Sequence, residues 1–231
     1  MTHMRDRWVA ERIRRSRQSI LLLGPRQVGK STLCHALAPD LYIDLADQAV
    51  FLSYSKDPGR LRRELAALPE ARLVVIDEAQ RVPTLLNTVQ SLIDARPRRL
   101  RFVMTGSSAR RLKRGGANLL PGRIILERLD PLCVGELRDA TDVDRGMRLG
   151  MLPGIYWGDD EASEVLGTYA DVYLREEVQA EALTTNIGGY ARFLDTIAAA
   201  SGQWINYSKL ASDAEIPKET LRRFIDEAKR T

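Results

Sequence analysis

A glycine-rich loop is the feature of this sequence whose residue types and spacing most clearly allow chemistry. The loop consists of Gly24, Pro25, Arg26, Gln27, Val28, Gly29, Lys30 and Ser31, and it matches the pattern G-x-x-x-x-G-K-[ST]. Glycines tolerate the backbone angles that turn N–H groups inward around an anion, so the pattern predicts phosphate binding. We expect Lys30 to reach the β- and γ-phosphates, Ser31 to ligate Mg²⁺ and Thr32 to hold the α-phosphate. A glycine turn with a solvent-facing lysine is the simpler interpretation.

Two adjacent carboxylates follow a second apolar stretch. The run Leu73–Ile76 is followed directly by Asp77 and Glu78. We expect Asp77 to hold Mg²⁺ beside Ser31, and a carboxylate in the position of Glu78 can polarise an attacking water. A protein that binds nucleotide without hydrolysing it does not need the second carboxylate. The simpler interpretation is a strand that runs into a solvated turn.

Polar and basic residues further along the chain are candidates for the same site. The apolar run that begins at Phe102 ends in small polar residues, and Thr105 or Ser107 is suited to orient the lytic water. A helix N-cap is the alternative role for Ser107 or its neighbour Ser108. Arginines can stabilise transition-state charge, and the candidates for this role are Arg110, Arg111 and Arg123.

Short apolar runs that alternate with helical segments must position these residues. The runs are 19–23, 41–45, 73–76, 102–105 and 123–129, and the helical segments lie at 5–17, after the loop to 38, and at 59–68, 83–95 and 107–112. Strands that are apolar throughout are typical of a parallel sheet covered by helices on both faces. The pattern therefore predicts an α/β domain over residues 1–131, with a basic helix at its N-terminus.

Residues 132–231 show helical patterns and form the second predicted domain. The expected helices are 160–182, 188–201, 208–213 and 217–230. Ser208 is expected to cap the third of these, and Pro217 suits the first position of the last. The two short helices predict a helix-turn-helix at about 206–230 with a winged-helix-like end.

Two basic segments make DNA a candidate partner. In the helix-turn-helix, the residues expected to face phosphates are Lys218, Thr220, Arg222 and Arg223. The acidic Asp213, Glu215 and Glu219 argue against a strong DNA surface there, and a module that packs on the first domain is the alternative. The stretch 96–114 holds basic residues and no acidic one; a solvated face is its simpler interpretation, with a contact to nucleic acid or to another subunit as the alternative.

Composition excludes several classes of protein. The 231 residues are 44% hydrophobic and 29% charged, with a net charge of +4 and two cysteines, which is ordinary globular composition without a disulfide framework. The arginine-rich N-terminus lacks the apolar core of a secretory signal, and no apolar run approaches the roughly 20 residues of a membrane span. We therefore expect a cytoplasmic protein with no membrane contact.

Motifs in a fixed order give the sequence a family resemblance. They are the loop at 24–32, VVIDEAQR at 74–81, TGSS at 105–108, LPGR at 120–123, LDPL at 129–132, GMLPG at 150–154, YADVYLREEV at 169–178 and GQWINYSKLASDAEIPKET at 202–220. Together they cover most of the chain. The sequence resembles the bacterial and archaeal AAA-type P-loop ATPases that pair an AAA_14 module with a C-terminal DUF4143 domain.

The resemblance implies more than the residues alone predict. It implies ATP as the nucleotide, a sheet with strand order 5-1-4-3-2, Glu78 as the catalytic base, and Arg123 acting at the nucleotide in the same chain or toward a neighbour in a homo-oligomer. Family members usually continue into a nuclease-like α/β domain, so we expect that this sequence is truncated in that part or is a short relative.

Three functions compete at this point. The first is Mg²⁺-dependent ATP hydrolysis coupled to movement of the helical domain. The second is a nucleotide-dependent switch, or a DNA-binding regulator, with little turnover. The third is a small-molecule kinase, against which the paired carboxylates Asp77 and Glu78 and the TGSS strand both argue.

Overall fold

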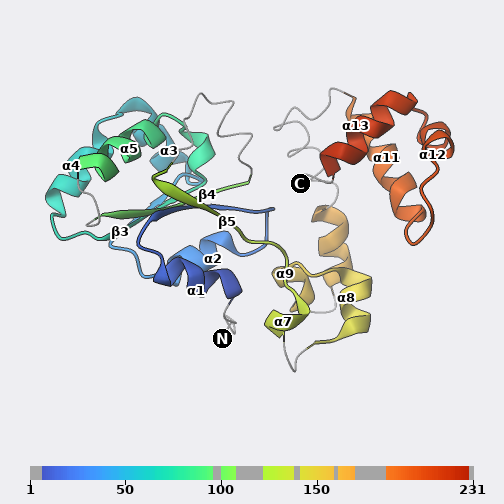
Figure 1. The fold of residues 1–231 in the computed structure, drawn as a ribbon, viewed down its shortest axis with the longest axis horizontal. Helices are drawn as coiled ribbons and strands as arrows, with labels where there is room; N and C mark the ends of the chain where they lie inside the picture. The colour runs from blue at the N-terminus through green and yellow to red at the C-terminus, as the bar shows by residue number, and fades with distance from the viewer. Residues whose placement is uncertain are drawn as a thin grey trace. The chain divides into compact units, whose positions relative to one another are not determined.

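A computed structural model describes residues 7–95, 100–107, 122–137, 141–158, 161–169 and 186–228 (Figure 1). The chain divides into two compact units, Met1–Asp159 and Asp160–Thr231. The boundary that the sequence predicts, near residue 131, lies inside the first unit. None of the described helices is long and apolar enough to cross a membrane.

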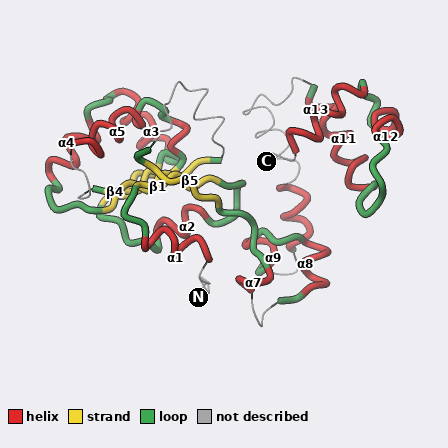
Figure 2. The backbone as a smooth tube through the Cα atoms, in the orientation of Figure 1, coloured by secondary structure: helices red, strands yellow, loops and turns green. Residues whose placement is uncertain are grey.

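A five-stranded parallel sheet forms the centre of the first unit (Figure 2). Its strands are β1 (Ser19–Leu23), β2 (Leu41–Asp44), β3 (Leu73–Asp77), β4 (Arg101–Gly106) and β5 (Ile124–Arg128). Their order is β2-β3-β4-β1-β5, which is the predicted order 5-1-4-3-2 counted from the other edge. The α/β fold and its strand order are therefore confirmed.

The central strands are apolar throughout because helices cover both faces of the sheet. One face packs against α3 (Gln48–Lys56), α4 (Arg60–Ala67) and α5 (Leu85–Ala95), and the other packs against α1 (Trp8–Arg15) and α2 (Lys30–His35). Neighbouring residues of one strand alternate between the two cores: Val74 and Ile76 join the first, and Val75 joins the second. This alternation follows from the two-residue period of a strand.

Helix α3 is an element that sequence reasoning missed. Its apolar residues follow no clear helical stripe, and a single residue of it, Tyr54, is buried. The start of the helix is nevertheless well defined, because the Asp47 carboxylate accepts a 2.9 Å hydrogen bond from the Val50 N–H. Of the helix predicted at 107–112, all but residue 107 lies outside the described residues.

In the described residues that follow the sheet, the first unit has three short helices. They are α7 (Val134–Leu137), α8 (Val143–Leu149) and α9 (Pro153–Tyr156). Leu132, Leu137 and Tyr156 form a small apolar cluster there, and the Leu132 N–H donates to the Met151 carbonyl at 2.8 Å. Residues beyond 131 thus extend the first unit. Helix α7 also contacts the start of α1, because the Glu136 carboxylate accepts a hydrogen bond from the Trp8 N–H.

The second unit is a helical module with an aromatic core. Its described elements are helical residues 162–169, α11 (Ile187–Ala199), α12 (Tyr207–Asp213) and α13 (Lys218–Ala228). Phe193 and Phe224 are fully buried between the last three helices, together with Tyr190 and Leu221. Helix α12 begins one residue earlier than predicted. Its cap is Asn206, whose side chain accepts from the backbone N–H groups of Ser208 and Lys209, so the predicted cap Ser208 is wrong.

Candidate functional site

The glycine-rich loop connects the end of β1 to the start of α2, and its backbone needs glycine at two points. A side chain on Gly24 would place its Cβ 2.0 Å from the Leu129 carbonyl oxygen. Gly29 has φ of 92°, in the left-handed region that glycine tolerates best. Gln27 also has a positive φ, of 63°. The loop is therefore held in a sharply turned conformation directly before a helix N-terminus, which is the geometry that suits an anion.

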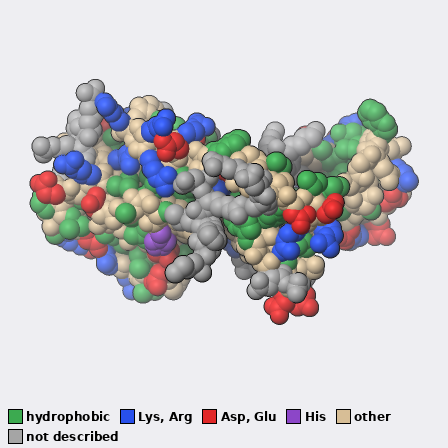
Figure 3. Space-filling view, turned by 90° about the horizontal axis from the view of Figure 1, so that it is seen from below, with side chains coloured by type: hydrophobic (Ala, Val, Ile, Leu, Met, Phe, Trp, Pro, Cys, Tyr) green, Lys and Arg blue, Asp and Glu red, His purple; other side chains and the backbone are tan. Residues whose placement is uncertain are grey.

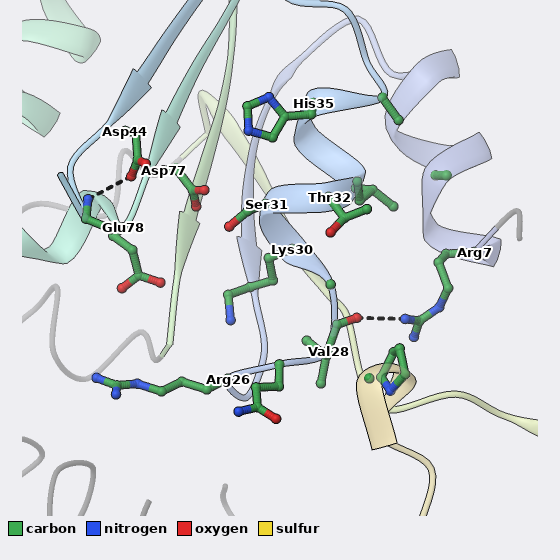
Figure 4. Close-up of a pocket in the computed structure, with 18 of the residues that line it drawn as sticks. Arg7, Arg26, Val28, Lys30, Ser31, Thr32, His35, Asp44, Asp77 and Glu78 are labelled. Carbon is green, nitrogen blue, oxygen red and sulfur yellow. Dashed lines mark hydrogen bonds between the residues drawn. The ribbon is translucent and has the colours of Figure 1, made fainter. Parts of the chain in front are cut away.

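Lys30 is the buried cation of the loop. The residue is 6% exposed, and its ammonium donates to the carbonyl oxygens of Gly24 at 2.8 Å and Pro25 at 2.6 Å. In Figure 4 the ammonium points away from α2, into the space beside the loop. The lysine is thus already positioned where the loop turns.

Asp77 is the acceptor at the centre of a buried hydrogen-bond network. Its carboxylate accepts from the Tyr42 hydroxyl at 2.6 Å and from the Thr105 hydroxyl. Burial, and then the hydrogen bond to Asp77, raise the pKa of Tyr42 well above its usual value, so this phenol stays a proton donor. In Figure 4 the Ser31 hydroxyl lies opposite the Asp77 carboxylate, so that oxygen atoms of the loop and of the strand face each other.

Glu78 directly follows the strand in a conformation that few non-glycine residues adopt. Its φ is 57° and its ψ is 43°, which costs about 1 kcal/mol or more and must be offset by the surroundings. The Glu78 N–H donates to the Thr105 hydroxyl at 2.9 Å, and its carboxylate accepts from the Gln80 side-chain amide. The left-handed backbone turns Glu78 out of the strand, and both Glu78 and Lys30 line the same pocket (Figure 4).

Gln80 and Tyr42 are site residues that sequence reasoning missed. Gln80 is 6% exposed, and its Oε1 atom is buried without a hydrogen-bond partner among the described residues. Its place in the motif VVIDEAQR was the available signal. Tyr42 gave no signal, because it falls in the middle of an apolar run that reads as a strand.

An open pocket of about 1310 Å³ brings these groups together. Its lining includes seven predicted loop residues and both predicted carboxylates: Arg26, Gln27, Val28, Gly29, Lys30, Ser31, Thr32, Asp77 and Glu78. Gly24 and Pro25 bind Lys30 through their carbonyls, and Thr105 contacts the two carboxylate residues from within the sheet. Further lining comes from α1 with Ala10 and Arg14, and from the α9 region with Pro153, Gly154 and Trp157.

Arg123 is not brought into this pocket. It precedes β5, whose first residue Ile124 pairs with Ser19 at the start of β1, while the loop follows the end of β1. The two ends of such a strand lie roughly 13 Å apart. The Arg123 guanidinium binds the Asp94 carboxylate at 2.7 Å, which raises the arginine pKa. An action of Arg123 in the same chain finds no support in this placement, and an action toward a neighbouring copy stays a prediction.

The basic stretch 96–114 is described only in part, and Arg110 and Arg111 lie outside the described residues. Within it, Arg101 of β4 turns inward and donates to the carbonyls of Ile13, at 2.9 Å, and Ser16. Burial lowers the pKa of Arg101. This arginine therefore fixes α1 to the sheet, which is a structural role.

Basic residues of the helical module have neighbours of their own. Lys218 donates to the Ser208 hydroxyl at 3.0 Å, and Arg222 pairs with Glu219 at 2.9 Å. The Arg223 guanidinium lies 5.7 Å from the centre of the Phe224 ring. On the face shown in Figure 3, basic side chains are interspersed with acidic and apolar ones. The predicted DNA surface at 206–230 stays a prediction.

Comparison with known sequences gives a family and two relatives. A family model described as AAA domain matches residues 16–138. The uncharacterized proteins Rv2008c of Mycobacterium tuberculosis and Mb2031c of Mycobacterium bovis are each 28% identical over 211 residues. The match covers 90% of this chain and 46% of each relative, so the chain spans about half the length of the curated relatives it matches.

Comparison with solved structures gives two distant similarities. One is to the ORC1 protein of Aeropyrum pernix in complex with DNA, at 13% identity and a TM-score of 0.39, covering 92% of this chain and 77% of that one. The other is to PCH-2 of C. elegans, at 15% identity and a TM-score of 0.34, covering 95% and 63%. Because both scores are below 0.5, the fold assignment rests on the sheet order and the family match.

Proposed function

Because the chain belongs to the family of AAA domains and carries the phosphate-binding loop, we propose that it binds Mg-ATP and hydrolyses the bond between the β- and γ-phosphates. The observation that carries this proposal is the meeting of Lys30, Ser31, Asp77 and Glu78 around one pocket. The four residues come from two segments more than forty positions apart in the sequence, and the sheet places both at the carboxyl ends of its strands.

The loop and the first carboxylate are suited to hold the phosphates and the metal. The Lys30 ammonium would exchange its two carbonyl acceptors for the β- and γ-phosphate oxygens, and the loop N–H groups would surround them. Ser31 and Asp77 offer the oxygen ligands that Mg²⁺ prefers. When bound there, the ion supplies charge neutralisation between the β- and γ-phosphates.

Glu78 is the residue that we propose to act in hydrolysis. Its carboxylate would take a proton from the attacking water as the water oxygen bonds to the γ-phosphorus and the bond to the β-γ bridging oxygen breaks. Thr105 would position the base by accepting the Glu78 N–H, which makes it a positioning residue rather than a catalytic one. Gln80 would set the direction of the Glu78 carboxylate.

The remaining lining of the pocket would contact the base and sugar of the nucleotide. Ala10, Pro153, Gly154 and Trp157 present apolar or backbone surface to the pocket, and apolar contacts suit a flat aromatic base. All four belong to the first unit, so the proposed nucleotide site requires no contact with the helical module.

Phosphate release with Mg-ATP tests this proposal in the parent chain, Lys30→Ala and Glu78→Gln. We expect Glu78→Gln to lower turnover by about 10²–10⁴-fold while a fluorescent ATP analogue still binds, because the change removes only the base. Lys30→Ala should lose binding and turnover together. Arg15→Gln serves as the control, since Arg15 pairs with Glu11 on the exposed face of α1. Unchanged turnover in Glu78→Gln would contradict the assignment of the base.

A nucleotide-dependent switch with little turnover is the second candidate. The observation in its favour is that both key side chains already have intramolecular partners: Gln80 binds Glu78, and two loop carbonyls bind Lys30. Binding of nucleotide without turnover in every variant would support this candidate. Movement of the helical module, DNA contact, a homo-oligomer, a cytoplasmic location and a DUF4143 domain remain predictions under either function.

A further inference from the structure

Arg7 is a largely buried arginine next to the phosphate-binding loop that neither the sequence motifs nor the family match includes, since the matched residues begin at 16. It directly precedes α1, and its side chain is 10% exposed. A charged side chain is rarely buried to this extent unless hydrogen bonds or an ion pair compensate its charge.

The partners of Arg7 belong to two segments that are distant in sequence. One Nη atom donates to the Val28 carbonyl of the loop at 2.8 Å. The other donates to the carbonyls of Asp130 and, at 3.3 Å, Pro131. Nε binds the Glu136 carboxylate at 3.0 Å, and Glu136 itself is 7% exposed. A planar guanidinium can donate hydrogen bonds in three directions at once. A lysine ammonium on its flexible side chain is less suited to hold three such acceptors.

The bond to Val28 fixes more than one carbonyl. A trans peptide is planar and directs its C=O and N–H to opposite sides. When Arg7 holds the Val28 oxygen on the outside of the loop, the Gly29 N–H must point to the other side. Figure 4 shows the Val28 carbonyl directed at Arg7 and away from the Lys30 ammonium. The Gly29 N–H is therefore held on the side where the phosphates are proposed to bind.

Glu136 keeps Arg7 in this orientation. Its carboxylate accepts from the Arg7 Nε and also from the backbone N–H groups of Trp8, at 3.0 Å, and Cys133, at 3.3 Å. Space is tight around this pair, because a Cβ on Gly135 would lie 2.3 Å from the Trp8 ring. The pair thus joins the start of α1, the loop and the segment 130–136.

We propose that Arg7 is a positioning residue of the nucleotide site, which orients the Val28–Gly29 peptide toward the phosphates and ties it to segment 130–136 through Glu136. This inference rests on the proposed nucleotide function. It predicts that the residues before the family match set nucleotide affinity, and that the segment leading out of the sheet responds to what the loop binds.

The test measures affinity for a fluorescent ATP analogue with Mg²⁺, and KM and kcat for ATP, in Arg7→Gln, Arg7→Lys, Glu136→Gln and the double variant Arg7→Gln/Glu136→Gln. We expect Arg7→Gln to weaken affinity by about tenfold, because a charged hydrogen bond to the loop is lost, with KM rising more than kcat falls. Arg7→Lys should lie between the parent and Arg7→Gln. The double variant should bind no more weakly than Arg7→Gln alone, because both changes break one unit. Arg15→Gln is the matched control.

A spectroscopic readout separates positioning from general stability. In ¹⁵N-glycine-labelled protein without nucleotide, the Gly29 amide resonance should shift in Arg7→Lys and Arg7→Gln and stay in place in Arg15→Gln. Parent-like affinity and an unmoved Gly29 amide in both Arg7 variants would overturn the inference and leave the proposed function standing. A parent chain that binds no nucleotide would instead overturn the proposed function, and the role of Arg7 with it.

Discussion

The two units of this chain use buried space differently. In the first unit, six polar or charged residues are buried among the described residues: Ser19, Lys30, Asp77, Gln80, Thr105 and Glu127. The second unit buries none in its described part, and its core is an aromatic cluster around Phe193 and Phe224. Burying polar groups costs free energy unless each finds a partner. The difference indicates that the first unit keeps a partnered polar network inside its core, whereas the core of the described helical module is held by apolar packing.

The largest expected effect tests whether the helical module can be weakened without disturbing the site. Phe224 is fully buried, and its ring centre lies 4.9 Å from that of Tyr190 and 5.6 Å from that of Phe193. Phe224→Ala should lower the free energy of unfolding of the module by about 3–5 kcal/mol, because it leaves a cavity. Denaturant unfolding followed by circular dichroism measures this, and nucleotide affinity should not change.

An exposed aromatic residue of the same module is the control for this prediction. Trp204 is 100% exposed, and Trp204→Ala should alter stability by less than about 0.5 kcal/mol. If Phe224→Ala lowers the nucleotide affinity as well as the free energy of unfolding of the module, the contrast between the two units does not hold.

A smaller effect is expected inside the polar network of the first unit. Thr105 donates to Asp77 and accepts from the Glu78 N–H, and it is fully buried. Thr105→Val keeps the shape but leaves the partly buried Glu78 N–H without its acceptor and the buried Asp77 carboxylate without one of its donors, so we expect a loss of about 1–3 kcal/mol in stability and a fall in kcat. Thermal unfolding and phosphate release measure the two effects. The exposed Thr84→Val is the control, and an unchanged kcat in Thr105→Val would show that the network is structural alone.

The smallest effect concerns pH. Asp40 accepts hydrogen bonds from the backbone N–H groups of Leu73 and Arg72, both at 2.8 Å, and these lower its pKa below the ordinary 3.8. Because the folded-state pKa is the lower one, the stabilising contribution is fully present above the unfolded pKa and is lost as pH falls through the folded value. Because Asp40 is exposed and solvent screens its charge, Asp40→Asn should destabilise by no more than about 0.5 kcal/mol at pH 7 and by less at pH 3. Urea unfolding at both pH values measures the free energy of unfolding of Asp40→Asn and of the parent. If the two proteins differ by the same amount at pH 7 and pH 3, this charge effect is excluded.

The parts of the fold that were predictable depend on short-range patterns. Each strand is a short apolar run, and the loop and the pair Asp77–Glu78 directly follow two of them, so their convergence follows from a parallel sheet. Helix α3 was missed because its single buried residue, Tyr54, leaves no apolar stripe to recognise.

The side chains that support the site were less predictable, since they meet through tertiary packing. Tyr42 reaches Asp77 from the neighbouring strand, and Arg7 reaches Val28 across 21 positions of sequence. No local spacing encodes either contact. Arg123 was a candidate because arginines can stabilise transition-state charge, and the family resemblance also implied it. The strand register places it at the opposite end of the sheet from the loop.

The hydrogen bonds of Lys30 to its own loop also affect the stability of the first unit when no nucleotide is bound. A buried ammonium without acceptors would cost several kcal/mol, and an empty site of that kind would favour unfolding. Here the Gly24 and Pro25 carbonyls supply the ammonium with acceptors inside the chain. Under the proposed function, a nucleotide that binds would displace these internal acceptors, so part of its binding free energy would offset their loss. The same two hydrogen bonds would hold the loop in its turned conformation whenever no phosphate is bound.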